Sequence, residues 1–311
     1  MTTGIIAPFN LSEGTSTPYV TIDEVLASPT AAAIDFTNLI ENGSDAVQRR
    51  ALQELIVRAS SKADNYCLGA LGTLNASVNV ENGRARPNRL GQFVIHPEFW
   101  PILELRTFAV GPLPGYSLNP ITLSANNVAI ERHQFIVTSP TGLSNITSIG
   151  SLDMVGGGWG QDRQAFVQYT YVNGFANAFL STNTAAGATS ITVGSSIGIY
   201  AGMNLTIWDG MNDENITVAS TYDNNSLTIP LVAGTTYNHG AGVNVSAMPA
   251  SIKQAVIHFV VALVKQRGQG GIVLNELGEP TAVSTRTETS MADEAQGKHL
   301  LDTFKQIWGR N

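Results

Sequence analysis

The sequence predicts an α+β fold, in which a helical bundle of N- and C-terminal helices is interrupted by a β-rich insertion that carries a small β-barrel or sandwich. Three observations predict it. Residues 249–268 are typical of a helix that is apolar on nearly every side, and residues 44–68 of an amphipathic helix. Between them, residues 77–246 alternate apolar and polar positions, separated by Gly, Pro and Asn.

The helix expected at 249–268 is the element that other parts of the chain must cover. Pro249 suits a first-turn position and Gly268 a helix end. One apolar stripe repeats at helical spacing and consists of Ile252, Val256, Phe259 and Leu263. Further apolar residues widen it: Ala255, Val260 and Val264. The apolar run is shorter than the roughly 20 residues that a membrane span needs, so we expect a buried helix. His258 is expected to be a hydrogen-bonded core residue.

The N-terminal part predicts an extended arm over residues 1–20 and a short helix that Thr21 caps and that ends near Ser28-Pro29. A long helix is expected from Ser44 to about Leu68, and a last one from about Met291 to Trp308. These two helices are the expected covers of the apolar helix.

The β-rich part divides in two. Residues 90–95 and 164–172 are its clearest strands, and residues 181–246 contain four more short strands at 190–193, 204–208, 215–218 and 226–229. We therefore expect four parts: an N-terminal arm and helical part (1–76), a β-rich region (77–180), a small inserted β module (181–246) and a C-terminal helical part that packs with the first (247–311).

Composition and charge restrict the function. The 311 residues have a formal charge of −7, and only 13% are charged. No Lys or Arg lies between Arg163 and Lys253, so that region cannot form a groove that follows a phosphate backbone. Cys67 is the single cysteine, which argues against a disulfide framework or a thiolate zinc site and suits a small core residue. The sequence also predicts no signal peptide.

One pentapeptide matches a catalytic pattern. Residues 194–198, GSSIG, fit the G-x-S-x-G nucleophile elbow with Ser196 as the nucleophile, and an esterase is the function it would indicate. That motif needs a helix after the serine, whereas Tyr200–Asn204 predicts another turn and strand. A tight β turn is the preferred interpretation.

The remaining polar clusters predict no active site. The histidines are scattered without metal-ligand spacing: His96, His133, His239, His258 and His299. Asp209, Asp213 and Glu214 could approach a cation, but their spacing differs from a Ca²⁺ loop, so a solvated turn is preferred. The densest basic group is expected in a solvated hairpin loop, with DNA or an acidic protein as alternative contacts: Arg84, Arg86 and Arg89. No cofactor or metal is expected.

Five segments, in this order, carry a resemblance to a known family: YVTIDEV (19–25), ADNYC (63–67), RQAFVQYTYVNGF (163–175), AMPASIKQA (247–255) and HLLDTFKQIW (299–308). Their order resembles the head–tail connector, or adaptor, family of tailed phages. Residues 188–243 are similar to a β module of the actinobacteriophage members. The resemblance covers most of the chain and rests on no catalytic signature.

The resemblance implies a virion protein of the neck, made in the host cytoplasm, with no catalytic activity. It implies a ring, usually dodecameric, that sits under the portal protein and continues the DNA channel toward the next neck or tail-completion protein. Genomic DNA would pass through without specific binding, which suits an acidic chain with few Lys and Arg residues, and no membrane partner is implied.

The resemblance also implies a portal-docking site at the C-terminal end. The candidate docking residues there combine apolar and basic side chains: Phe304, Lys305, Trp308 and Arg310. Alternatively, Trp308 caps the helical core. A rival function is binding of the capsid surface or a host glycan by the β module, but Trp208 is the only tryptophan in residues 181–246. An esterase is the most remote alternative.

Overall fold

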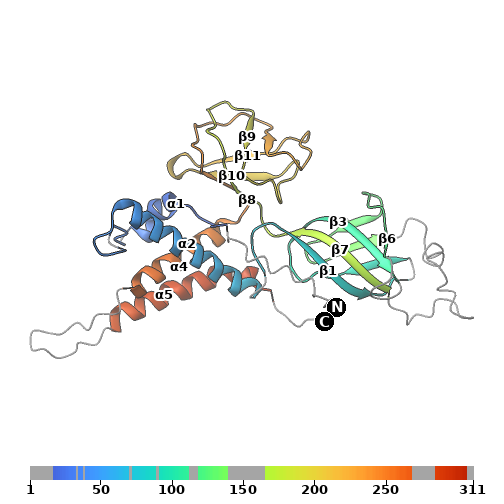
Figure 1. The fold of residues 1–311 in the computed structure, drawn as a ribbon, viewed down its shortest axis with the longest axis horizontal. Coiled ribbons are helices and arrows are strands. Elements are labelled where there is room, and N and C mark those ends of the chain that lie inside the picture. Colours follow the sequence, from blue (N-terminus) through green and yellow to red (C-terminus); the bar gives the residue numbers. More distant parts are fainter. Residues whose placement is uncertain are drawn as a thin grey trace, which may run out of the picture. The chain divides into compact units, whose positions relative to one another are not determined.

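A computed structural model describes residues 17–32, 34–37, 39–69, 72–88, 91–111, 118–138, 165–267 and 284–306, without the side chains of 211, 267 and 284–289. The fold is α+β, with separate helices and antiparallel sheets (Figure 1). The described chain forms two compact units. One contains residues 76–174, and the other combines residues 17–75 with 175–306.

The unit of residues 76–174 consists of two antiparallel sheets that share one core. Its strands are β1 (Ser77–Ala85), β2 (Gln92–Ile95), β3 (Ile102–Gly111), β4 (Asn119–Pro120), β5 (Val128–Ile130), β6 (Phe135–Thr138) and β7 (Ala165–Asn173). The sheet orders are β1-β7-β3-β4 and β2-β6-β5. Alternate residues of β7, from Ala165 to Tyr171, enter the core beside Phe93 and Phe135 of the second sheet. Alternation therefore correctly predicts which face of β7 is buried.

The inserted β module has a core of its own within the second unit. Its strands are β8 (Asn177–Phe179), β9 (Ser190–Thr192), β10 (Asn204–Trp208), β11 (Glu214–Thr217), β12 (Thr228–Pro230) and β13 (Asn244–Ser246), and the 3₁₀ helix η2 covers Gly210–Asn212. The described strands form two sheets, β11-β10-β13-β8 and β12-β9, and neither closes into a barrel. Of the two expected forms, barrel or sandwich, the barrel is therefore wrong. Because β8 pairs with β13, the module's sheet begins at Asn177, four residues before the start expected from the sequence.

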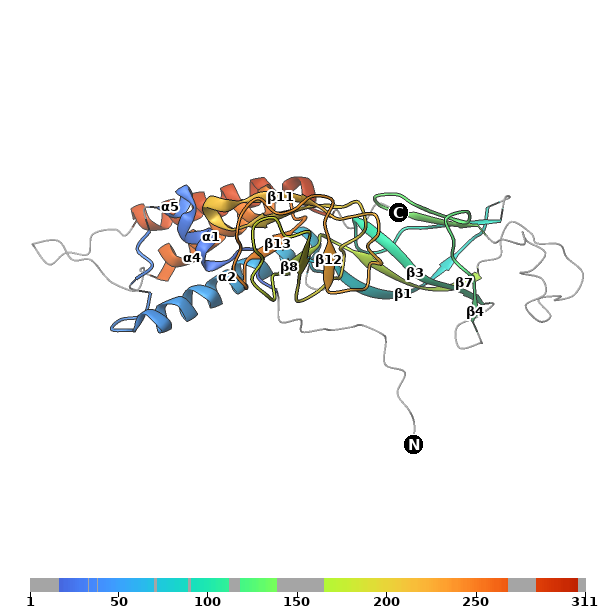
Figure 2. The ribbon, with the colours of Figure 1, turned by 90° about the horizontal axis from the view of Figure 1, so that it is seen from above.

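The helices of the second unit are α1 (Ile22–Ala27), α2 (Asp45–Leu68), α4 (Ala250–Arg267) and α5 (Ser284–Leu301), with 3₁₀ helices η1 (Pro29–Ala31) and η4 (Asp302–Phe304). Thr21 caps α1 as expected, and Glu24 completes a capping box. Helix α4 contacts both α2 and α5, and the three lie side by side in Figures 1 and 2. Phe259, on the apolar stripe of α4, is fully buried.

Helix α5 differs from its expected form. It begins at Ser284 and ends at Leu301, whereas the sequence predicted Met291–Trp308. Small side chains and ion pairs, in place of an apolar stripe, hold it against its neighbours. Gly297 faces Phe259 so closely that an added Cβ would lie 2.6 Å from the ring. Asp293 accepts from Lys265 of α4 at 2.5 Å.

Candidate functional site

The C-terminal segment, for which the resemblance to the adaptor family implies docking, folds back onto the end of α2. Tyr66 donates from its hydroxyl to Asp302 Oδ1 at 2.5 Å, and the Gln306 N–H donates to the Cys67 carbonyl at 2.8 Å. The Lys305 ammonium lies 4.9 Å from the Tyr66 ring centroid. Residues 302–306 are therefore held in place by contacts within their own unit.

Of the four candidate docking residues, the structure brings two to this place. Phe304 is half-buried and meets the Phe175 ring edge to face, with centroids 6.0 Å apart. Lys305 is exposed. Trp308 and Arg310 lie outside the described residues. The described part of the candidate site thus has one exposed cation, Lys305, beside the Tyr66 ring, and a half-buried Phe304 next to it in the sequence.

Cys67 lies under this segment and is the core residue that the sequence predicts, with 1% of its surface exposed. Burial, together with the negative charges of Asp64 and Asp302, raises the pKa of its thiol to about 12. A thiol with such a pKa stays protonated at neutral pH and is a poor nucleophile.

A second cluster, which the sequence did not predict, joins α1, α4 and the β module. Lys253 projects from α4 and is 3% exposed. Its ammonium donates to Glu24 Oε1 at 2.5 Å and to Asn244 Oδ1 at 2.7 Å, and it lies 4.6 Å from the Trp208 ring centroid. Burial lowers the pKa of Lys253, and the Glu24 carboxylate partly offsets this effect. We call these four residues the Lys253 junction.

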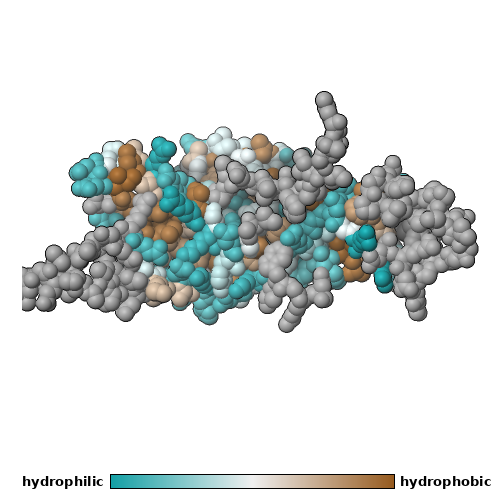
Figure 3. Space-filling model, turned by 60° about the horizontal axis from the view of Figure 1, so that its bottom comes forward, coloured by the Kyte–Doolittle hydropathy of each residue, from teal (hydrophilic) through white to brown (hydrophobic). Residues whose placement is uncertain are grey.

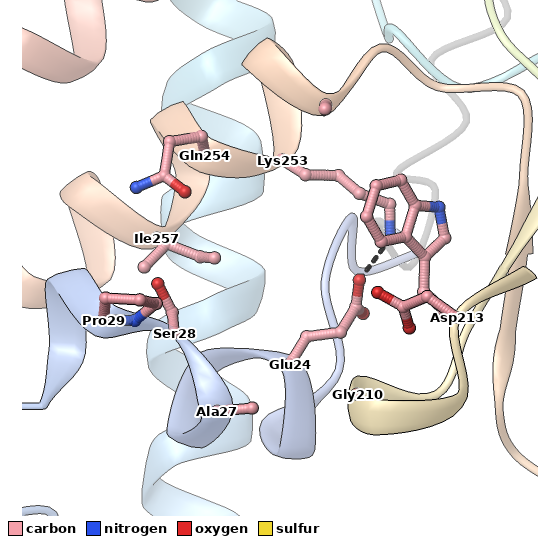
Figure 4. A pocket seen from close by; sticks show the side chains of 11 residues that line it. Glu24, Ala27, Ser28, Pro29, Gly210, Asp213, Lys253, Gln254 and Ile257 are labelled. Carbon is pink, nitrogen blue, oxygen red and sulfur yellow. Dashed lines mark hydrogen bonds and ion pairs between the residues drawn. The ribbon is translucent and has the colours of Figure 1, made fainter.

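A pocket of about 270 Å³ opens beside the Lys253 junction (Figure 4). Its apolar lining includes Ala27, Pro29 and Ile257, and its polar lining includes Asp213 and Gln254. Gln254 is already bonded to the Thr30 hydroxyl at 2.7 Å. The pocket is therefore a mixed apolar and acidic hollow between the short helix α1, α4 and the module.

No protein-family model, curated protein or solved structure matches this chain.

The acidic residues of the module do not form a cation site. His239 has a buried side chain between two carboxylates, with Nδ1 2.8 Å from Asp209 Oδ2 and Nε2 2.7 Å from Glu214 Oε1. The two ring nitrogens point to opposite sides, so the carboxylates do not converge on one ion. Among the described residues, no group of three or more His, Cys, Asp or Glu side chains is arranged to hold a metal.

Glu214 also differs from the solvated turn residue that the sequence suggested. Burial alone would raise the pKa of its carboxyl, but hydrogen bonds from the Thr236 N–H and from His239 outweigh burial and lower it. Glu214 and His239 therefore act as a structural pair that ties β11 to the chain near residue 239.

The G-x-S-x-G sequence forms a turn. Gly194–Gly198 follows the isolated bridge at Val193, and the Ile199 N–H donates to the Ser196 carbonyl at 3.1 Å. The chain then continues to β10, without the helix that a nucleophile elbow requires. The side chains of Ser196 and Tyr222 are hydrogen-bonded to each other. Residues 194–198 therefore form the tight turn that we preferred over a nucleophile elbow.

The other polar candidates are separate. Arg84 is exposed on β1, which places it in a strand and not in the expected hairpin loop; Arg86 is exposed just after it, and Arg89 lies outside the described residues. His258 is mostly buried, but its Nδ1 has no hydrogen bond within the described residues and lies 3.8 Å from Asp293 Oδ1. The expectation of a hydrogen-bonded core histidine is wrong at that atom.

Large exposed hydrophobic side chains of the helical part are spread over several elements: Leu26, Ile40, Val47 and Met291. On the face shown in Figure 3, hydrophobic and hydrophilic residues are interspersed. Single exposed apolar residues are normal on protein surfaces, so they do not define a docking face. No helix in the described part of the chain has the length and apolar character to cross a membrane.

A buried carboxyl holds the segment before α1 against α2. Asp64 accepts hydrogen bonds from the Tyr19 hydroxyl and, at 2.8 Å, from the Leu74 N–H. The Tyr19 N–H donates to Ser60 Oγ at 3.2 Å. Burial raises the pKa of Asp64 to about 7 because the charged form loses water.

This carboxyl predicts a pH-dependent stability. The folded state holds the Asp64 proton more tightly than the unfolded chain, so its stabilising effect is complete below about pH 4 and is lost as the pH rises to about 7. Relative to Asp64→Asn, we expect the wild-type free energy of unfolding to fall by up to about 1.4 kcal/mol per pH unit over that window. Urea denaturation between pH 4 and 8 measures the difference.

Asp45→Asn is the matched control, because Asp45 is an exposed carboxylate at the start of the same helix. Its pH profile should follow the wild type. A wild-type profile parallel to that of Asp64→Asn would contradict the prediction.

Proposed function

We propose that this chain is a structural virion protein, a head-to-tail adaptor that forms a ring below the portal, extends the DNA channel and links capsid to tail. In this proposal the helices form a bundle that is the body of the ring, and the β-rich residues are an insertion into it. The ring's partners are further copies of the chain, the portal protein and the next neck or tail protein, and DNA passes through without specific contacts.

One observation carries the proposal. Four of the five segments that resemble the adaptor family, although far apart in the sequence, contact each other in the helical part. Tyr19 of the first bonds Asp64 of the second. Glu24 of the first also pairs with Lys253 of the fourth, 229 residues away. Tyr66 of the second bonds Asp302 of the last. Segments that resemble the family therefore supply several of the long-range contacts that hold this part together.

The charge distribution also supports the proposal. Residues 175–247 contain no Lys or Arg and four acidic residues: Asp209, Asp213, Glu214 and Asp223. Like charge disfavours tight contact with DNA phosphates. A surface of this kind suits a protein past which DNA must slide.

A glycan-binding role of the β module has less support. Aromatic side chains that bind sugars must present an open ring face, and Trp208 is the module's only tryptophan. Its ring lies against the Lys253 ammonium in the junction. The module therefore lacks an exposed tryptophan platform.

The proposal is tested by measuring the mass of the purified protein, alone and mixed with purified portal protein from the same phage. We expect a ring, or a portal complex with several copies of this chain, in native mass spectrometry and in electron micrographs. A protein that stays monomeric both alone and in the presence of the portal protein contradicts the proposal.

The C-terminal docking site gives a separate prediction. Removing residues 307–311, which include Trp308 and Arg310, is expected to abolish portal binding without unfolding the protein, because the anchors Leu301 and Gln306 remain. Pull-down on immobilised portal measures binding, and circular dichroism checks the fold. Alanine at exposed Arg84 is the control and should bind normally. A folded, truncated protein that still binds the portal moves the contact elsewhere.

A further inference from the structure

The pocket beside the Lys253 junction has a charge that favours one kind of ligand. Lysine has three N–H donors; Lys253 uses two of them for hydrogen bonds to Glu24 and Asn244, and the Trp208 ring lies against the same ammonium. The ammonium is therefore buried and surrounded by its own partners, which makes it a poor site for an incoming anion. Glu24 neutralises its charge.

Asp213 lines this pocket as a second carboxylate near Lys253, so one cation faces two negative charges and the pocket keeps a net negative charge. Asp213 is exposed, and one of its oxygens accepts the Asp209 N–H at 2.6 Å. Figure 4 shows its carboxylate turned toward the Glu24–Lys253 pair. The walls around it are apolar and include Ala27, Pro29 and Ile257. An aliphatic stem with a cationic end matches both the walls and the charge.

We propose that this pocket binds a lysine or arginine side chain of a second copy of this chain. The side chain's methylene groups lie against the apolar walls, and its cationic end pairs with Asp213. This inference deepens the proposed function and rests on it, since a ring places the pocket of one subunit against a different face of its neighbour.

Charge and exposure favour α2 as the donor face. No Lys or Arg occurs between Arg163 and Lys253, whereas the outer face of α2 presents Arg50 and Arg58 at helical spacing. Their side chains are 84% and 65% exposed, and each contacts Glu54 at the long distances of 3.9 and 4.0 Å. Because these contacts with Glu54 are long, either arginine can pair with a neighbouring subunit and give up little interaction within its own chain.

Charge reversal tests the proposal in the full-length protein. Asp213→Arg should weaken self-association, and Asp213→Asn, which removes charge without adding bulk, should raise the dissociation constant per contact about fivefold. Combining Asp213→Arg with Arg50→Glu or with Arg58→Glu in the same chain should restore assembly, because the swapped pair forms between neighbours. Analytical ultracentrifugation at two salt concentrations measures each variant.

Asp223→Arg is the matched control, since Asp223 is an acidic residue of the same module that does not line the pocket, and it should assemble as the wild type does. Melting temperatures show whether each variant is folded. If the wild type assembles and folded Asp213→Asn assembles equally well, the inference is overturned while the proposed function stands. If neither double variant recovers, the α2 arginines are not the ligand and the inference is overturned in that form. A wild type that assembles neither alone nor with portal overturns both.

Discussion

Replacing Lys253 by methionine is expected to destabilise the unit that contains the helices by about 3 kcal/mol, because it leaves the Glu24 carboxylate buried without its counter-charge. Methionine keeps the length and the apolar stem of lysine, so little packing is lost. Asn244 and Trp208 also lose their contact with the ammonium. Urea unfolding followed by tryptophan fluorescence measures the change.

Two further variants separate the charge effect from packing. Adding Glu24→Gln to Lys253→Met should recover most of the loss, since glutamine is neutral and still suits the capping box of α1. Lys265→Met is the matched control on the same helix, because its pair with Asp293 is more exposed to water. Equal losses for Lys253→Met and Lys265→Met would show that burial of the Lys253 pair carries no special weight.

Replacing Gly297 by alanine is expected to destabilise the contact between α4 and α5 by about 2 kcal/mol, although alanine is the better helix former by about 1 kcal/mol. The new Cβ would lie 2.6 Å from Phe259 Cε1 and 3.1 Å from the Ala255 carbonyl oxygen. The Phe259 ring is fully buried, so any shift that makes room for the methyl group must displace other core side chains. The melting temperature should fall accordingly.

Phe259→Leu combined with Gly297→Ala should recover part of this loss, because the smaller side chain leaves space for the methyl group. Gln296→Ala, one position away on the exposed side of α5, is the control and should leave stability nearly unchanged. If Gly297→Ala raises the melting temperature, the helices are not in the close contact described for them.

The elements that sequence patterns predict well are those with strong local signals. Residues 250–267 form α4 because one proline, one glycine and a wide apolar stripe mark its limits and its burial. Alternation likewise predicts β7. Helix α5 was predicted with wrong limits because its packing depends on Gly297 and on ion pairs, which have no apolar period. Met291, where the sequence placed its start, is 64% exposed.

The residues of the candidate site were also hard to predict, because their partners are distant in the sequence. Lys253 stands among apolar residues, and no local pattern links it to Glu24 or Asn244, so its partners follow only from the fold. His239 is similar, since its two carboxylates come from residues 25 and 30 positions away. Only Asp209 and Glu214 themselves were marked as candidates, for a cation that their geometry does not bind.

The joining of distant segments in the helical part also governs when this protein can fold. Glu24 cannot pair with Lys253 until another 229 residues have been synthesised, and Tyr66 likewise cannot pair until Asp302 has been made. At about 5–20 residues per second, a ribosome takes roughly 10 to 50 s to make the intervening chain. During that time α1 and α2 are without their main partners, while residues 76–174 have a complete core. We therefore expect the middle of the chain to fold first, and newly made α2 to be the segment most exposed to chaperones and proteases.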